Sequence, residues 1–375
     1  MKLFQQLLIA PAALGLLAPL AASASEVNLD AISNYSENNL EIDANSFKQK
    51  SSNNILISGG EGLVETTDII GGFSETTTAS FGVDFLFGAA DGGSTGVSEA
   101  TTFDYQMGIG LETSFTGEDA LSATIDIGNA SSVVGGADGL NFDGTSDALK
   151  LDGLTYTFPV GGTTVMVGDN TDISAVYTGA CAYSSFTDYM GNCGTGNSVG
   201  VGGKGVTAAA SYAFDSGVSL AGGVSSTQIT DSGAVPGLLT EEGVDVYGIE
   251  AAYTADSYGV SVAYSDNESS TFWGINGNYA FDFATISVGV ESEDTGSTTK
   301  EGYFVGISFP EVGAGSFDIG MGTTGNFSDS DTEYYIYEAS YAYPINDGMT
   351  ITPGIYIREG STDQTGFALK TSFSF

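Results

Sequence analysis

The sequence predicts an all-β protein, a transmembrane antiparallel β-barrel of about sixteen strands of the outer-membrane type. Apolar and polar side chains alternate over segments of about ten residues, the pattern of a strand with one apolar and one polar face. Tight turns alternate with longer loops, and aromatic side chains gather on the apolar faces. A soluble β-sandwich would share the alternation, but it gives no reason for turns and loops to alternate in length.

The first residues predict a secretory signal peptide that ends at Ala24. Met1-Lys2 is a positive start, residues 3–20 are mostly apolar, and residues 21–24 supply the small side chains of a cleavage site. A retained anchor helix is the alternative. A membrane-spanning helix needs about 20 apolar residues, however, and this apolar run is shorter and is interrupted by prolines. We therefore expect a signal peptide at 1–24, an N-terminal periplasmic segment at 25–78 and the barrel at 79–375.

The period-two segments give the expected strands of the barrel. They are 79–88, 103–115, 119–129, 147–159, 163–170, 204–214, 218–226, 243–254, 258–265, 270–282, 284–292, 300–310, 314–324, 332–344, 349–358 and 365–375. Tight turns such as 116–118, 215–217 and 255–257 separate some neighbours, and loops such as 130–146 and 171–203 separate others. Short turns on one side and long loops on the other are typical of outer-membrane barrels.

Aromatic residues and one proline refine this picture. The strand 332–344 carries several tyrosines on one face, and the last strand ends with Phe373 and Phe375 on its apolar face. Aromatic side chains form girdles at the two membrane interfaces of such barrels. Pro353 lies inside the strand 349–358 and cannot donate a ladder hydrogen bond, so we expect a β-bulge at Pro353-Gly354.

Charge and composition exclude several classes of function. The chain has 8 basic and 47 acidic residues; cleavage removes Lys2, so the mature net charge is 7 − 47 = −40. Such a chain repels nucleic acid and anionic membrane surfaces, and it would attract cations if the charge faced a confined space. The absence of histidine excludes Ser-His-Asp and Cys-His catalysis and removes the commonest metal ligand. We expect no enzyme, no cofactor and no metal site.

Cys181 and Cys193 are the only cysteines. In a secreted chain an even pair favours a disulfide, whereas free thiols or half of a zinc site are the alternatives. Zinc is disfavoured because the chain lacks histidine and a Cys-x-x-Cys motif. A disulfide would close a loop of 13 residues (193 − 181 + 1), which the chain-entropy relation values at about 3 kcal/mol.

Several segments resemble a known family. Residues 1–15, Gly59 to Gly62, Thr113 to Asp119, Tyr156 to Gly161 and Thr371 to Phe375 resemble porins of marine unicellular cyanobacteria, and the likeness spans nearly the whole chain. The resemblance implies a 16-stranded outer-membrane porin, often trimeric, related to the carbohydrate-selective porins and sometimes labelled an iron-uptake porin. These relatives usually carry an S-layer-homology domain before the barrel. Residues 25–54 are too short for one and lack its Asp-Trp-Ala-Tyr type motif, so wall anchoring is not carried over.

The resemblance also implies roles for two segments. In trimeric porins the loop after the fifth strand folds inward and narrows the pore. The corresponding loop here is 171–203, which contains Asp172 and Asp188 beside the cysteines, although a stiff surface loop would have the same sequence. The terminal Phe373 and Phe375 are similar to the recognition signal of the barrel-assembly machinery.

Strand parity predicts the side chains that face the lumen. They are the acids Asp84, Asp104, Glu112, Asp126, Glu250, Asp318 and Glu338 and the bases Arg358 and Lys370. Low-dielectric walls focus the field of such a set, so cations should be enriched inside. The alternative is that these acids merely hydrate a water-filled lumen.

The expected function is passive diffusion of small hydrophilic solutes and inorganic ions, with cations favoured. A substrate-specific channel for a sugar or an iron species is one alternative, and a structural or adhesive barrel with a closed lumen is another. The expected partners are outer-membrane lipid and the barrel-assembly machinery, with a homotrimer implied by the family and no nucleic acid.

Overall fold

The structure is a computed structural model that describes residues 77–92, 101–130, 140, 142, 144–200, 205–227, 238–239, 244–323 and 333–375. The predicted signal peptide lies outside the described residues, as does the predicted N-terminal segment up to residue 76. Thr77 and Thr78, the last two residues of that segment, already belong to the first strand.

Sixteen strands make up the described barrel. They are β1 (Thr77–Gly92), β2 (Thr102–Thr113), β3 (Ala120–Gly128), β4 (Lys150–Val160), β5 (Thr163–Thr171), β6 (Gly205–Ala213), β7 (Val218–Thr227), β8 (Val244–Thr254), β9 (Tyr258–Asp266), β10 (Thr271–Ala280), β11 (Thr285–Asp294), β12 (Thr299–Val312), β13 (Gly315–Thr323), β14 (Tyr335–Asn346), β15 (Met349–Arg358) and β16 (Gln364–Ser374). Each predicted strand is confirmed, with ends that differ by at most four residues.

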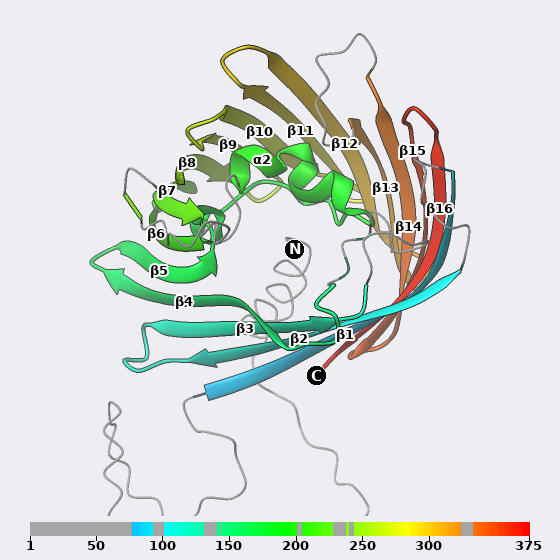
Figure 1. The fold of residues 1–375 in the computed structure, drawn as a ribbon, viewed down its shortest axis with the longest axis horizontal. Coiled ribbons are helices and arrows are strands. Elements are labelled where there is room, and N and C mark those ends of the chain that lie inside the picture. Colours follow the sequence, from blue (N-terminus) through cyan, green and yellow to red (C-terminus); the bar gives the residue numbers. More distant parts are fainter. Residues whose placement is uncertain are drawn as a thin grey trace, which may run out of the picture. The chain divides into compact units, whose positions relative to one another are not determined.

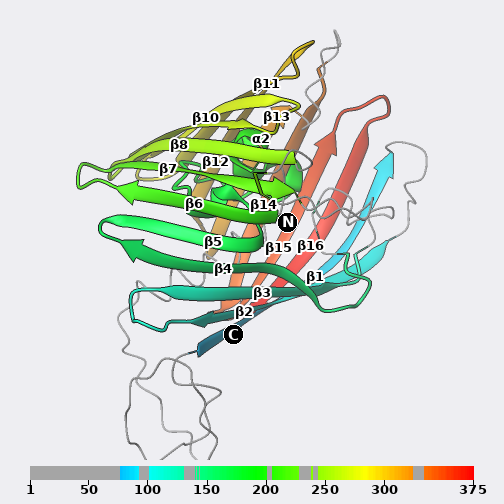
Figure 2. The ribbon, with the colours of Figure 1, turned by 60° about the vertical axis from the view of Figure 1, so that its left-hand side comes forward.

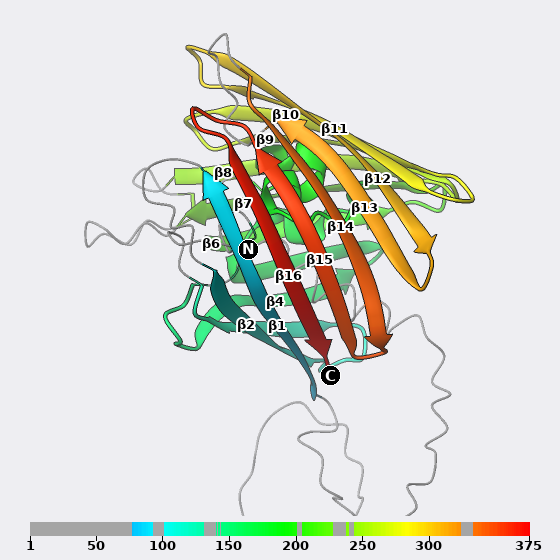
Figure 3. The same cartoon turned by 90° about the vertical axis from the view of Figure 1, so that its right-hand side faces the viewer.

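The sheet is closed and antiparallel throughout. Every strand pairs with its neighbour along the chain, and β1 pairs with β16 in a register that places Val83 opposite Phe373 (Figure 3). The tilted strands follow one another around the wall in sequence order (Figure 2). Closure removes the free edges that would otherwise leave backbone groups unpaired in a membrane.

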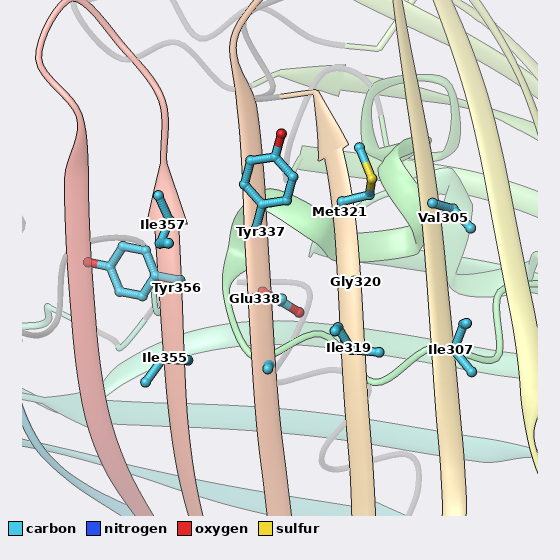
Figure 4. Close-up of a pocket in the computed structure, with 11 residues that line it drawn as sticks. Val305, Ile307, Ile319, Gly320, Met321, Tyr337, Glu338, Ile355, Tyr356 and Ile357 are labelled. Carbon is cyan, nitrogen blue, oxygen red and sulfur yellow. The ribbon is translucent and has the colours of Figure 1, made fainter.

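Side chains alternate between the inner and outer faces of this wall. In β1, Phe85 and Phe87 are 36% and 50% exposed on the outside, whereas Asp84 and Leu86 between them are buried. The same rule places isoleucines and other large apolar side chains of β12 to β15 on the outer face, where they surround a shallow apolar hollow (Figure 4). Such an apolar exterior suits a hydrocarbon environment. Among the described residues, no helix is long and apolar enough to span a membrane.

The bulge expected at Pro353-Gly354 is absent, so that prediction is wrong. The register between β15 and β16 is continuous, with Pro353 opposite Leu369. Toward β14, the pairs Ser340–Gly354 and Tyr343–Ile351 keep one register, and no pair forms at Pro353 itself. Because proline has no N–H, β15 lacks a backbone pair with β14 at Pro353, but its register with both neighbouring strands is unchanged there.

Candidate functional site

The connection between β5 and β6 folds into the barrel. Residues 172–200, here called the constriction loop, contain the short turns η4 (Ile173–Val176), η5 (Asp188–Gly194) and α2 (Gly196–Val199). Figure 1 shows these turns inside the ring of strands. The main contacts of these turns are with strands β6 to β13, and Phe186 between η4 and η5 packs with Leu86 of β1 and Ala368 of β16.

Apolar side chains pack two parts of the constriction loop against the wall. Near its start, Ile173 packs in a buried cluster with Met166 and Val246 of the wall. Further along, Met190 packs in a second cluster with Phe304. Because these loop side chains are removed from water, the loop is part of the packed interior of the barrel.

The predicted disulfide between Cys181 and Cys193 is confirmed, with 5.6 Å between the Cα atoms. We call the closed segment 181–193 the disulfide loop. Asn192 and Cys193 both adopt left-handed backbone conformations, with φ of 52° and 53°, where the chain reverses toward α2. Cys193 itself is fully buried.

Three inward glutamates hold three successive parts of the constriction loop. Glu250 of β8 accepts hydrogen bonds from the backbone N–H groups of Thr178 and Gly179, at 2.7 and 2.9 Å. Glu291 of β11 accepts from the N–H groups of Asn197 and Ser198. Both carboxylates are buried, so the loop supplies the donors that water would otherwise provide.

Glu338 of β14 holds the middle part, the disulfide loop. One carboxylate oxygen accepts from the Tyr183 hydroxyl at 3.0 Å and the Phe186 N–H at 2.8 Å. The other oxygen accepts from the N–H and the hydroxyl of Thr187 at 2.8 and 2.5 Å. Burial, together with the charge and hydrogen bond of Glu338, raises the pKa of Tyr183 far above its usual range, which keeps its hydroxyl a donor.

Glycines on the inner wall make room for the loop. A Cβ atom on Gly289 would lie 1.8 Å from the carbonyl oxygen of Cys193, and one on Gly354 would lie 2.4 Å from the ring of Phe186. Gly320 is similarly covered by the Tyr183 hydroxyl, at 2.6 Å from where its Cβ would be. Any larger side chain at these positions would push the loop away from the wall.

All seven acids predicted to face the lumen lie on the inner face, but the structure buries six of them. Asp84, Asp104, Asp126, Glu250, Asp318 and Glu338 are each at most 8% exposed, and only Glu112 is exposed. The expectation that Glu250 and Glu338 face open water is therefore corrected, because the constriction loop covers both. Asp84 accepts a hydrogen bond from Gln106 at 2.8 Å.

The remaining predicted site residues differ in their surroundings. Asp172 is buried and caps η4 by accepting from the Ser174 N–H, so it is a structural residue and not a group that meets a solute. Asp188, by contrast, is exposed. Arg358 is half-buried, donates a hydrogen bond to the Tyr189 hydroxyl at 2.8 Å and stacks 4.6 Å above its ring. Lys370 is half-buried on β16.

The last predicted pair, Phe373 and Phe375, lies where β16 closes against β1. Phe375 stacks on Phe81 with ring centroids 5.5 Å apart and exchanges two backbone hydrogen bonds with it. Phe373 makes an edge contact with Phe85 at 6.0 Å. Phe375 remains 75% exposed at the end with the short turns.

Sequence reasoning missed two residues of the site, Glu291 and Asn276. Asn276 accepts from the Ala180 N–H at 3.0 Å and donates to the Thr195 hydroxyl at 2.9 Å. Strand parity could have placed Glu291 inward, because Val288 and Val290 lie on the opposite, exposed face. Parity cannot predict that the loop binds Glu291. Within the described part of the chain, no three potential metal ligands gather at one place.

A closed wall of sixteen strands with a loop docked inside it defines the porin type of outer-membrane barrel. Solved structures agree. The chain is similar to a mutant of the Rh. blastica porin, with TM-score 0.55, 17% identity, and 80% of this chain and 100% of that one covered. It is also similar to Pseudomonas putida OprB, with TM-score 0.60, 11% identity, and 80% and 94% covered.

A third similar structure is the loop L8 deletion mutant of OmpT, an outer membrane protein of Vibrio cholerae. Its TM-score is 0.56 at 10% identity, with 80% of this chain and 100% of that one covered. At such low identities, the likeness concerns the fold. No family model matches the chain, and no curated protein matches it in sequence.

Proposed function

We propose that the protein is an outer-membrane channel for passive diffusion of small hydrophilic solutes and inorganic ions. The observation that carries this proposal is the constriction loop, which is held against the inner wall. A structural barrel needs no such loop, whereas a diffusion channel needs a narrow section that selects by size.

Preference for cations is the second part of the proposal. The constriction loop carries two charged residues, Asp172 and Asp188, and both are acidic. Asp188 is exposed and can act on a passing ion, while Arg358 is held against Tyr189. Acidic charge within a low-dielectric wall raises the local concentration of cations.

A sugar- or iron-specific channel has less support. Sugar sites stack aromatic rings along open water, but the inward Tyr183, Phe186, Phe304 and Tyr356 are buried. Tyr189 is half-buried, and the Arg358 guanidinium lies over its ring. Association with outer-membrane lipid, insertion by the barrel-assembly machinery and a homotrimer remain part of the proposal. They are supported by the apolar exterior and by the fold.

Conductance across a planar bilayer tests this function. Purified barrel should give discrete, ohmic current steps in KCl. Uncharged polyethylene glycols of increasing size should enter the pore up to a cut-off and lower the current until that size is reached. Folded barrel that inserts without any current steps would favour a closed structural barrel instead.

A further inference from the structure

We infer that Glu338 is the positioning residue of the pore: it latches the disulfide loop to the wall and thereby sets the width of the constriction. This inference rests on the proposed channel function. It concerns a single carboxylate and a single segment, so it can fail while the channel function stands.

The first step is that the three anchoring glutamates hold different segments. Glu250 binds residues before the disulfide loop, and Glu291 binds residues after it. Glu338 accepts its hydrogen bonds from within the disulfide loop, from Tyr183, Phe186 and Thr187. Loss of the Glu338 contacts should therefore release the disulfide loop while both flanking segments stay in place.

The second step is that the disulfide fixes the shape of this loop and not its position. The Cys181–Cys193 bond joins the two ends of the segment, so the segment can move as one closed unit. The left-handed backbone of Asn192 and Cys193 lies at one of these ends. Apolar packing and the hydrogen bond from Arg358 to the Tyr189 hydroxyl also contact this unit.

The third step is that both oxygens of Glu338 are needed as acceptors. Each of them receives two donors, and the side chain is only 3% exposed, so water cannot replace them. Replacement of one oxygen by an amide NH2 would place a donor against the donors of the disulfide loop. Protonation of one oxygen would do the same. On the wall, Glu338 is opposite Gly320 and Tyr356.

Other ionisable groups lie nearby and must be separated in a test. Asp318 is on β13 beside Glu338, Arg358 is on β15, and Tyr183 and Asp188 belong to the disulfide loop. Burial raises the pKa of Tyr183 far above its usual range, so its hydroxyl stays protonated between pH 4 and 7. Asp318 and Asp188 are carboxylates, so each needs its own variant before a pH response is assigned to Glu338.

The test compares the full-length wild type with Glu338→Gln, with Asp318→Asn and Asp188→Asn as controls for pH. Asp347→Asn, in the exposed turn between β14 and β15, is the control outside the loop. Two properties are measured at pH 7: single-channel conductance and the rate at which dithiothreitol reduces the disulfide. Glu338→Gln should lower the open-channel conductance and the polyethylene glycol cut-off, because a loop released from the inner wall moves into the lumen. It should also speed reduction about ten-fold or more, the change in released population expected from loss of one charge-assisted hydrogen bond.

A pH series separates positioning from a general structural effect. As pH falls from 7 to 4, the wild type and all three controls should shift toward the conductance and reduction rate of Glu338→Gln. The Glu338→Gln variant itself should respond little. If this variant fails to fold, as judged by heat-modifiable migration, the wild-type pH series with the controls still decides the matter.

Two outcomes would overturn the inference. One is a folded Glu338→Gln barrel whose conductance and reduction rate match those of the wild type. The other is a pH response that disappears in Asp318→Asn or Asp188→Asn and persists in Glu338→Gln. A wild type that conducts no current would contradict the channel function instead, and the reduction rates would still report whether Glu338 holds the loop.

Discussion

Single residues on the inner wall determine how closely the constriction loop approaches it. Glycines provide contact without a side chain, and glutamates provide acceptors for the loop's backbone donors. Gly289 and Glu291 show both on one strand, because Gly289 is covered by the Cys193 carbonyl and Glu291 receives the start of α2. The chain's 54 glycines are therefore partly explained by docking and not by turns alone.

Gly289→Ala tests this contact at the residue scale. The added methyl group would meet a backbone carbonyl at 1.8 Å, so either the loop or the strand must move. Overpacking of this kind typically costs about 1–3 kcal/mol. Urea unfolding in lipid vesicles should show a lower midpoint for this variant. Gly110→Ala is the matched control, because its methyl group would meet only the Ser80 hydroxyl, which can rotate. Equal midpoints for the two variants would disagree with this account.

Asp119 gives a prediction about pH from outside the spanning strands. Its burial raises the pKa, but hydrogen bonds from Ser114, Thr116 and Tyr156 outweigh that effect and lower the pKa well below its usual range. The pKa of an aspartate in the unfolded chain is about 4. When folding lowers that pKa, the carboxylate stabilises the fold fully above pH 4, and this stabilisation is lost as the pH falls toward the folded pKa.

Asp119→Asn should therefore destabilise the turn before β3 at pH 7, because the neutral amide cannot accept all of these bonds. The difference from the wild type should narrow as pH drops from 4 toward 2. Urea midpoints of both proteins across this pH range would measure it. A gap that stays constant down to pH 2 would show that the charge of Asp119 does not matter.

At the scale of elements, the strands were predictable because period two is a local property of the sequence. A lipid-facing Phe85 next to an inward Asp84 is visible without knowledge of any partner strand. The docked loop was not predictable in the same way. Parity places Glu250 inward whether water or a loop meets it, and only the structure shows the N–H groups of Thr178 and Gly179 there.

Two local features could not be predicted from the sequence for a related reason. The bulge expected at Pro353 is absent because one lost ladder bond is tolerated when both neighbouring registers are fixed by the rest of the strand. Asp172 was assigned to the constriction because it lies in the loop that the family resemblance places inside the pore. Its actual role as a cap depends on the turn that Ile173 begins.

The last strand carries a prediction about assembly. Phe375 pairs with Phe81 across the β1–β16 seam and is largely exposed, so insertion factors and lipid can contact it. Deletion of Phe375 should reduce the amount of heat-modifiable barrel in the outer membrane while export across the inner membrane continues. Phe214→Ala is a useful control, since Phe214 is also an exposed aromatic residue beside a short turn and is distant from the seam in sequence. Normal barrel levels after the deletion would argue against an assembly signal.

At the scale of the whole molecule, net charge and burial must be considered together. The formal charge of −39 suggests a strongly negative lumen. Six of the seven inward acids are buried, however, and two of these hold the constriction loop through hydrogen bonds. The acids that a passing ion can approach are therefore fewer than the sequence suggested, and Asp188 and Glu112 are the principal ones among those considered.

This distinction gives the prediction on ion selectivity. Salt at about 0.15 M screens charges beyond roughly 8 Å, so charges at the constriction should outweigh those on the outer rim. A KCl gradient should give a reversal potential that shows K⁺ preferred over Cl⁻, and the preference should shrink as salt rises. Asp188→Asn and Glu112→Gln should each reduce it. Asp347→Asn, in the exposed turn between β14 and β15, should leave it unchanged.

The same measurement can also show that the buried acids matter. Asp126→Asn removes a charge that is 3% exposed, and we expect a smaller change in reversal potential than for Asp188→Asn, because a buried carboxylate is not in contact with the ion's path. If Asp126→Asn has the larger effect, the field of the wall acts through the covering residues and exposure is the wrong criterion. A reversal potential of zero, or one that favours chloride, would show instead that Arg358 and Lys370 dominate the narrow section or that the pore is too wide for its walls to act on ions.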